Sequence, residues 1–417
     1  MNAHVLVAQG AVQFGDPGPV AAWVHFVRAV AVFALLLLST ALLIWFERRL
    51  VARMQSRLGP NRLGPGGVLQ TLADGVKLFF KEDIRPDNID APVYFLAPLI
   101  APVTAFLAFA IVPFGGQVTV AGETFGLQLF DPDIGVLWFL AMGSIHVYGV
   151  VLAGWSSGSA YPLLGAVRSS AQMISYELAM GLSVAAVFVY AGSLRVSDIV
   201  AIQAGPGLIA GVPNWFVLPL FPAFAIFAVA LIAETARPPF DLPEAEEELV
   251  AGFHTEYSGI KFGMFFLGEF MNVITGSAVI VTLFLGGPAG PVLTQTAGWV
   301  WPVLWFALKT AIFVCVFVWL RATLPRMRYD KLQRLGWNVM LPIGFVWVFA
   351  AAAMILINTT LDFRDRVTVG AGGLAAGLLL YLFAPMFSRV AERTLRRPRA
   401  EDRTFDEPEK ISTGGEG

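Results

Sequence analysis

Nine runs of about 20 mostly apolar residues, separated by prolines, glycines or charges, dominate the 417-residue sequence. A helix needs about 20 such residues to cross the hydrocarbon core of a bilayer. We therefore predict an all-α, polytopic membrane protein. The predicted transmembrane helices cover residues 22–46, 92–114, 135–155, 171–190, 216–234, 262–285, 301–320, 339–357 and 369–387.

The distribution of basic residues predicts how these helices are oriented. If the N-terminus lies outside the cell, the inner segments contain 23 Lys and Arg residues and the outer segments contain three. Cytoplasmic loops carry the excess of positive charge in membrane proteins. We therefore expect a short outer segment over residues 1–21. Residues 388–417 contain charges and prolines but almost no apolar side chains, which predicts a disordered cytoplasmic tail.

The composition excludes several classes of function. The 28 basic residues nearly balance the 30 acidic ones, whereas a nucleic-acid-binding domain has a strongly basic face. The single cysteine, Cys315, cannot support a disulfide framework or a thiolate-bound iron–sulfur cluster. His146, in the third predicted span, has no partner at metal-ligand spacing, so we expect it to pack as a polar residue. We predict that this chain binds no metal, flavin or iron–sulfur cluster.

The first long inner loop, residues 47–91, combines arginines with turn-forming glycines and prolines. After these turns, residues 68–80 place apolar side chains at helical spacing, with Asp74 and Lys77 on another face. This pattern predicts an amphipathic helix that lies along the membrane surface. The density of arginines favours a docking surface for a partner, and a plain interfacial anchor is the alternative.

The second long inner loop, residues 234–261, contains a crowd of carboxylates. Its prolines end the fifth predicted span, because proline removes a backbone donor and clashes with the preceding turn. Four glutamates then follow at the predicted start of a short helix: Glu244, Glu246, Glu247 and Glu248. Carboxylates this close repel one another, so we expect some of them to hold protons near neutral pH. A solvated acidic helix start is the alternative.

Ionisable residues also occur inside the predicted spans. Glu177, Glu234 and Glu269 are expected in the inner third of three successive helices, and Lys309 near the middle of the seventh. Each such group costs at least about 2.5–3.5 kcal/mol on insertion scales, so by default it marks an ion or proton path. The alternative for any one of them is a structural ion pair, for example between Lys309 and a glutamate.

Segments of both inner loops resemble one protein family. Residues 47–83 contain ERR, RLGPNRLGPGG and LADGVKLFFKED, and the second loop with its extension reads ETARPPFDLPEAEEELVAGFHTEYSGIKFGMFFLGEF. SSAQMISYEL around Glu177, WFALK around Lys309 and RATLPRMRYDKLQRLGW fit the same family. Over residues 20–360 the chain thus resembles the H subunit of NADH-quinone oxidoreductases, the bacterial counterpart of mitochondrial subunit 1 of respiratory complex I.

The resemblance implies a fold, a function and partners. The family has eight core transmembrane helices, here residues 22–360, so a ninth helix over residues 361–387 and the tail lie beyond it. The subunit anchors the peripheral arm, builds much of a quinone chamber and links quinone reduction to proton translocation. The implied partners are quinone, the bilayer of a bacterial inner membrane, the peripheral quinone-site and iron–sulfur subunits, the small membrane subunits and the antiporter-like subunits.

The resemblance also assigns residues. The implied quinone-chamber residues are Arg57, Arg62, Asp74, Lys81, Arg237, Asp241, Glu246 and Glu248. The implied proton path contains Glu177, Glu234, Glu256 and Glu269, and the depth of Lys309 adds that residue to it. The immediate electron and proton donors to quinone are expected on neighbouring subunits, so we assign no catalytic residue in this chain and expect quinone only as substrate.

Three other functions remain open at this point. Related subunits of membrane-bound hydrogenases share much of the loop chemistry and need not reduce a quinone. A stand-alone proton-coupled transporter fits the buried charges but predicts a central polar cavity and activity in isolation. A purely structural anchor leaves Glu177, Glu269 and Lys309 unexplained.

Overall fold

The computed structural model describes residues 21–120, 122–205, 213–241, 249–290 and 299–360. The chain divides into two compact units, Met1–Ala352 and Ala353–Gly417. The first unit contains the elements described below, and the second is described only as far as residue 360, where helix α12 ends. The predicted ninth span and the tail lie outside the described residues, as do residues 1–20 of the predicted outer segment.

The described part of the chain confirms the all-α prediction. It contains seven apolar helices long enough to cross a membrane and an eighth, shorter apolar helix, α7. These eight correspond to the first eight predicted spans. They are α1 (Ala22–Met54), α3 (Ala91–Phe109), α4 (Gly135–Ser156), α5 (Ala160–Ala191), α7 (Phe221–Glu234), α9 (Gly259–Phe284), α10 (Val300–Thr323), and a continuous segment made of α11 (Tyr329–Arg334), the π-helical turn Leu335–Met340 and α12 (Leu341–Thr360).

Two helices are longer than the apolar spans predicted for them. Helix α1 continues to Met54, and α5 begins at Ala160 rather than at residue 171. Polar residues such as Arg168 and Ser169 therefore lie inside α5, where Ser169 is fully buried. Because of this extension, Glu177 lies about midway along α5, roughly 25 Å from its first residue, rather than near the start of the helix.

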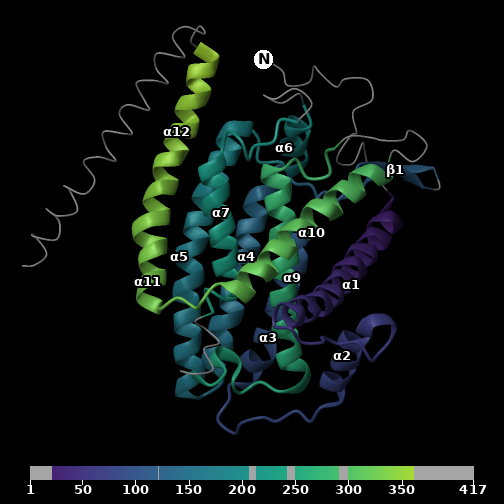
Figure 1. Cartoon of the computed structure of the whole chain (residues 1–417), viewed down its shortest axis with the longest axis vertical. Coiled ribbons are helices and arrows are strands. Elements are labelled where there is room, and N and C mark those ends of the chain that lie inside the picture. Colours follow the sequence, from purple (N-terminus) through teal and green to yellow (C-terminus); the bar gives the residue numbers. More distant parts are fainter. Residues whose placement is uncertain (1–20, 121, 206–212, 242–248, 291–298, 361–417) are drawn as a thin grey trace, which may run out of the picture. The chain divides into compact units, whose positions relative to one another are not determined.

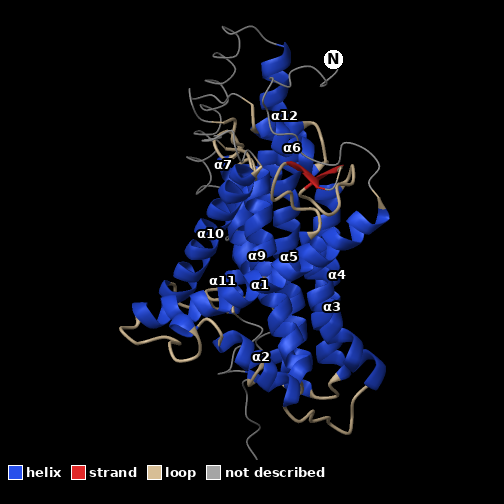
Figure 2. Ribbon diagram, turned by 90° about the vertical axis from the view of Figure 1, so that its right-hand side faces the viewer, coloured by secondary structure: helices blue, strands red, loops and turns tan. Residues whose placement is uncertain are grey.

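The shorter elements mark the two ends of the helix bundle. The amphipathic helix is α2 (Gln70–Phe80), and its apolar side chains Leu72, Phe79 and Phe80 are exposed, as expected for an interfacial helix. At the other end, β1 (Gln117–Val120) and β2 (Glu123–Gly126) form an antiparallel hairpin, and α6 (Val196–Gln203) lies at the same end of the bundle (Figures 1 and 2). We call these the α2 end and the hairpin end. The sequence did not predict the hairpin or α6.

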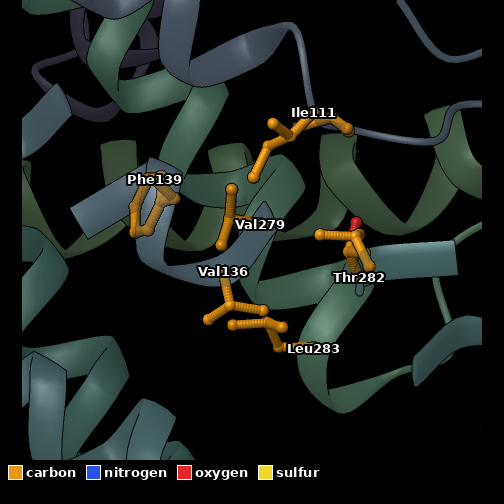
Figure 3. Close-up of a pocket in the computed structure, with 8 residues that line it drawn as sticks. Ile111, Val136, Phe139, Val279, Thr282 and Leu283 are labelled. Carbon is orange, nitrogen blue, oxygen red and sulfur yellow. The ribbon is translucent and has the colours of Figure 1, made fainter. Parts of the chain in front are cut away.

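Close packing of α3, α4, α5, α7 and α9 depends on small residues. A side chain at Gly268 of α9 would come within 2.9 Å of Ala101 on α3, and one at Gly276 would meet Leu231 of α7. Small residues allow helix backbones to approach closely in membranes, where apolar burial alone gives no preference for protein over lipid. The resulting core is dense: the small pocket between Ile111, Val136, Phe139, Val279 and Leu283 has about 10 Å³, space for at most one water (Figure 3).

Candidate functional site

A chain of ion pairs crosses the α2 end of the bundle. Arg321 of α10 pairs with Glu47 of α1, and Arg237 lies 4.0 Å from the same Glu47 carboxylate oxygen. Arg237 also pairs through Nε with Glu269 of α9. Its guanidinium carbon lies 4.3 Å from the ring centroid of Phe270, which adds a cation–π contact. The four charged side chains therefore connect α1, α9, α10 and the segment after α7.

The local sequence after α7 places Arg237 in this position. Helix α7 ends at Glu234, and Ala236 adopts a positive φ of 50°, which reverses the backbone. Pro238 and Pro239 then prevent the helix from continuing. The buried Arg237 side chain is thus directed toward Glu269 rather than toward solvent.

A cavity of about 420 Å³ opens beside this chain of ion pairs. Its lining is rich in charged and polar side chains: Glu47, Arg48, Val51, Ala52, Gln55, Arg57, Pro238, Arg321 and Ala322. Of the predicted chamber residues, Arg57 lines this cavity directly, and Arg237 adjoins it through Pro238 and its contact with Glu47. An anionic or polar head group is the chemistry that three arginines around one cavity would favour.

Asp74 contributes by fixing α2 against α1. Its carboxylate pairs with Arg48, which lines the cavity, and accepts a hydrogen bond from Gln70 Nε2 at 3.1 Å. Partial burial acts to raise the pKa of Asp74, but the hydrogen bonds from Arg48 and Gln70 and the nearby positive charges outweigh it and lower the pKa. Trp45 and Arg49 of α1 both donate to Gly66 O at 3.0 Å, so the turn before α2 is held to α1 as well.

The other predicted chamber residues are dispersed. Arg62 and Lys81 are exposed at the α2 end and do not line this cavity. Asp241 is half-buried, next to Phe240. Glu246 and Glu248 lie outside the described residues. Glu256, which was predicted for the proton path, precedes α9, and its backbone oxygen accepts a hydrogen bond from Tyr94.

Glu177 and Glu234 face one point on α4. A Cβ atom built on Gly143 would lie 3.1 Å from Glu234 Oε1 and 3.9 Å from Glu177 Oε1. The two oxygens are therefore no more than about 7 Å apart, the sum of these distances. Ser144 donates a hydrogen bond to Glu177. Glu234 Oε2 is buried and has no hydrogen-bond partner in the described part of the chain.

The Glu177 side of this pair opens into a second cavity, of about 540 Å³. Apart from Ser144 and Glu177 its lining is apolar or glycine: Leu140, Ile174, Leu178, Gly181, Leu182 and Leu341. A carboxylate exposed to an apolar groove of this size is suited to receive a polar group from a neighbouring transmembrane helix, since an isolated charge facing lipid is costly.

Lys309 lies at the hairpin end, at the C-terminus of α9. Its ammonium group donates to three backbone oxygens, Leu285 O at 2.8 Å, Gly287 O at 3.0 Å and Ala289 O at 2.7 Å. Nζ also lies 5.1 Å from the Trp215 ring centroid. The hydrogen-bond partners of Lys309 in the described part of the chain are thus backbone carbonyls of the turn that follows α9. The predicted place of Lys309 in a proton path stays a prediction without a supporting contact.

Sequence reasoning missed two members of the ion-pair chain, Glu47 and Arg321. Both lie one residue beyond the end of a predicted span, where a charge looks like an ordinary interfacial residue. The signal that could have found them is complementarity: two arginines and two glutamates near the same predicted side of the membrane. Within the described ranges, no cluster of three or more His, Cys, Asp or Glu side chains could hold a metal ion.

Membrane-length helices, a charged cavity and paired carboxylates within the helix bundle define a polytopic membrane protein with ionisable groups among its apolar helices. Residues 27–352 match the NADH dehydrogenase family. The chain is 52% identical over 362 residues to the H subunit of the NADH-quinone oxidoreductase of Frankia casuarinae and 51% identical to that of Frankia alni. Each alignment covers 86% of this chain and 78% of the relative. The chain therefore belongs to the NADH dehydrogenase family, as its loops had indicated.

Proposed function

We propose that this chain is the membrane subunit of a proton-translocating NADH-quinone oxidoreductase. In this role it forms much of the quinone chamber, anchors the peripheral arm and links quinone reduction to proton movement. The names of its relatives support an oxidoreductase complex whose substrate is a quinone and whose other subunits are its partners. The same names favour a quinone reductase over the hydrogenase alternative.

One observation carries the proposal: Arg237 connects the charged cavity to an intramembrane glutamate. On one side it contacts Glu47, which lines the cavity, and on the other side it pairs with Glu269 in α9. A change of charge in the cavity therefore acts on Glu269 through one buried guanidinium. Electrostatic interactions of this kind are strong where water is scarce.

The mechanism that follows assigns this chain a coupling role. Reduction of quinone to quinol takes two electrons and two protons, and neighbouring subunits supply the electrons and the immediate protons. The charge that develops at the head group is stabilised by Arg57, Arg48 and Arg321 around the cavity.

Arg237 then redistributes its interaction between Glu47 and Glu269, which changes the proton affinity of Glu269. The change is passed on to Glu234 and Glu177, which lie close enough to each other to exchange protons as a pair.

The remaining assignments are part of the same proposal. We place Arg62 and Lys81 in the seat of the peripheral arm, and Asp241, Glu246 and Glu248 at the chamber. Glu256 stays a candidate for the proton path. For Lys309 we propose a structural role instead, because its ammonium group donates to three backbone oxygens. We also propose a bacterial inner-membrane location with the α2 end on the cytoplasmic side, because the basic residues concentrate in the loops of that end.

The test is to replace Arg237 by lysine in the assembled complex. Lysine keeps the positive charge but loses the planar fork that reaches two carboxylates at once. We expect quinone-dependent NADH oxidation to fall by about tenfold or more, with oxidation by a soluble artificial electron acceptor unchanged.

Arg195→Lys is the matched control. Arg195 also contacts two carboxylates, Asp131 at 3.3 Å and Asp133 at 3.5 Å, but at the hairpin end. This variant should keep normal quinone turnover. Equal effects of the two substitutions, or normal turnover in Arg237→Lys, would contradict the proposed function.

A further inference from the structure

One buried titratable side chain is not used by the mechanism above. His146 lies in α4 with only 8% of its surface exposed. Its Nδ1 atom is 3.4 Å from Thr104 Oγ1 on α3, and its Nε2 atom is 3.3 Å from Asn272 Nδ2 on α9. Three helices are therefore joined at one imidazole.

The hydrogen bonds around His146 indicate which ring nitrogen carries a hydrogen. The Thr104 hydroxyl donates its hydrogen to a backbone carbonyl, Ile100 O at 2.8 Å. It can therefore only accept from the imidazole, so Nδ1 carries a hydrogen. Nε2 is then a free acceptor for the amide hydrogen of Asn272. The imidazole is neutral in this arrangement, and Nε2 is the position where a further proton can bind.

His146 lies between the two groups of carboxylates. On α4 it is three residues from Gly143, the residue that faces Glu234 and Glu177. On α9 its partner Asn272 is three residues from Glu269. Residues three apart are neighbours on one face of a helix, with Cβ atoms about 5–6 Å apart. The His146–Asn272 contact is thus one helical turn from Glu269 on one side and one turn from the Glu234–Glu177 pair on the other.

We propose that His146 is the proton-carrying residue between Glu269 and the Glu234–Glu177 pair. In this step Nε2 accepts a proton released from the Glu269 side, and the Asn272 amide turns so that its carbonyl oxygen accepts the new N–H. Nδ1–H stays on Thr104 throughout. The proton then leaves Nε2 for Glu234 or Glu177, which restores the neutral imidazole and the original amide orientation.

This inference rests on the proposed function, because it supplies the link that the carboxylates alone lack. Glu269 is paired with Arg237, whereas the other two glutamates face Gly143 across α4. An imidazole can bind and release a proton at one nitrogen while the other keeps its hydrogen, and ionisable residues buried in membrane helices commonly serve proton relays. The competing explanation is that His146 only holds α3, α4 and α9 together through its hydrogen bonds.

The test uses the assembled complex in sealed membrane vesicles and compares two variants. His146→Gln retains a polar side chain of similar reach but cannot carry a proton. Thr104→Val removes the hydrogen bond at Nδ1 without removing the nitrogen that binds the proton. We expect His146→Gln to lower quinone-dependent turnover or protons moved per electron by roughly tenfold, and Thr104→Val to stay within about twofold of the unmodified protein.

The opposite order, or equal effects of the two variants, assigns His146 a structural role and overturns the inference. If His146→Gln does not assemble, as judged by artificial-acceptor activity, Asn272→Leu replaces it, because that variant leaves His146 in place but removes the group that accepts the new N–H. An unchanged proton-to-electron ratio in Asn272→Leu overturns the inference.

Glu234→Gln in the same membranes distinguishes a failure of the His146 proposal from a failure of the proposed function. An inactive Glu234→Gln with a normal His146→Gln rejects His146 as carrier but keeps the proposed function. Normal activity in both variants rejects the proposed proton path itself.

Discussion

Lys309 and the Glu177–Glu234 pair are both ionisable groups within apolar helices, but their surroundings differ. Three fixed backbone carbonyls surround the ammonium group of Lys309. The two glutamates face each other across Gly143, and a buried oxygen of Glu234 has no hydrogen-bond partner among the described residues. Backbone carbonyl dipoles favour a charged ammonium group, whereas two neighbouring carboxylates disfavour being charged at the same time. The cost of burying a charge identifies both sites, and from their geometry we propose a functional role for the two glutamates and a structural role for Lys309.

Glu234→Gln should produce the largest effect and tests the functional half of this comparison. Glutamine has nearly the same shape but cannot exchange a proton, so we expect coupled quinone reduction to fall by about a hundredfold. Turnover and proton uptake in membrane vesicles measure the effect. Normal coupled turnover in this variant would mean that the two glutamates, like Lys309, have a structural role only.

Lys309→Met tests the structural half and should affect stability rather than chemistry. Methionine fits the space but donates no hydrogen bond, so the carbonyls at the end of α9 lose a charged partner. We expect about 2–3 kcal/mol of lost stability, seen as a lower Tm of the purified chain in detergent, with normal activity per assembled complex. Lys309→Arg keeps the donors and serves as the control. A proton-translocation defect in Lys309→Met at full assembly would return Lys309 to the proton path.

Gly143→Ala sharpens the comparison with a smaller change. The added methyl group would lie 3.1 Å from Glu234 Oε1, closer than an ordinary contact, so the carboxylate must shift. We expect a two- to fivefold loss of coupled turnover, because a small displacement of a proton-exchanging group slows transfer without abolishing it. Gly75→Ala in α2 is the matched control, since an added Cβ there meets nothing within 4 Å. Equal turnover in both variants would argue against a functional contact at Gly143.

Asp83 provides the smallest effect and a pH test of a fixed ion pair outside the spans. Burial acts to raise its pKa, but Lys261 at 2.7 Å and Arg85 at 2.8 Å outweigh burial and lower the pKa below the ordinary value of 3.8. A lowered pKa means that the ionised form stabilises the folded state above about pH 4, and that this contribution is lost as the pH falls through the lowered value. Asp83→Asn should therefore cost up to about 1 kcal/mol at pH 7 and less at pH 3.5. Thermal unfolding at the two pH values measures this difference, and an equal cost at both would contradict the ion-pair account.

Hydropathy predicted the eight described apolar helices because each buries or faces apolar surroundings along most of its length. It misplaced the start of α5, since the polar residues around Arg168 continue the helix past the apolar window. It also missed the hairpin of β1 and β2, whose strands have only four residues each. Segments this short carry too little alternation to be distinguished from a loop.

The candidate site was predictable residue by residue but not pair by pair. Glu269, Arg237 and Glu177 stood out individually, from burial cost or from the family resemblance. The pairing of Arg237 with Glu269 depends on the backbone reversal at Ala236, which no local pattern indicated. His146 was interpreted as a polar packing residue because its partners, Thr104 and Asn272, are 42 and 126 residues away in the sequence.

The number of protons moved per electron, measured side by side in vesicles carrying Glu234→Gln or Lys309→Met, tests most directly whether the glutamate pair is functional and Lys309 structural. We predict that Glu234→Gln abolishes coupled proton movement, while Lys309→Met keeps the normal ratio in whatever fraction of the complex assembles. A normal ratio and turnover in Glu234→Gln, or a lowered ratio in fully assembled Lys309→Met, would contradict this distinction.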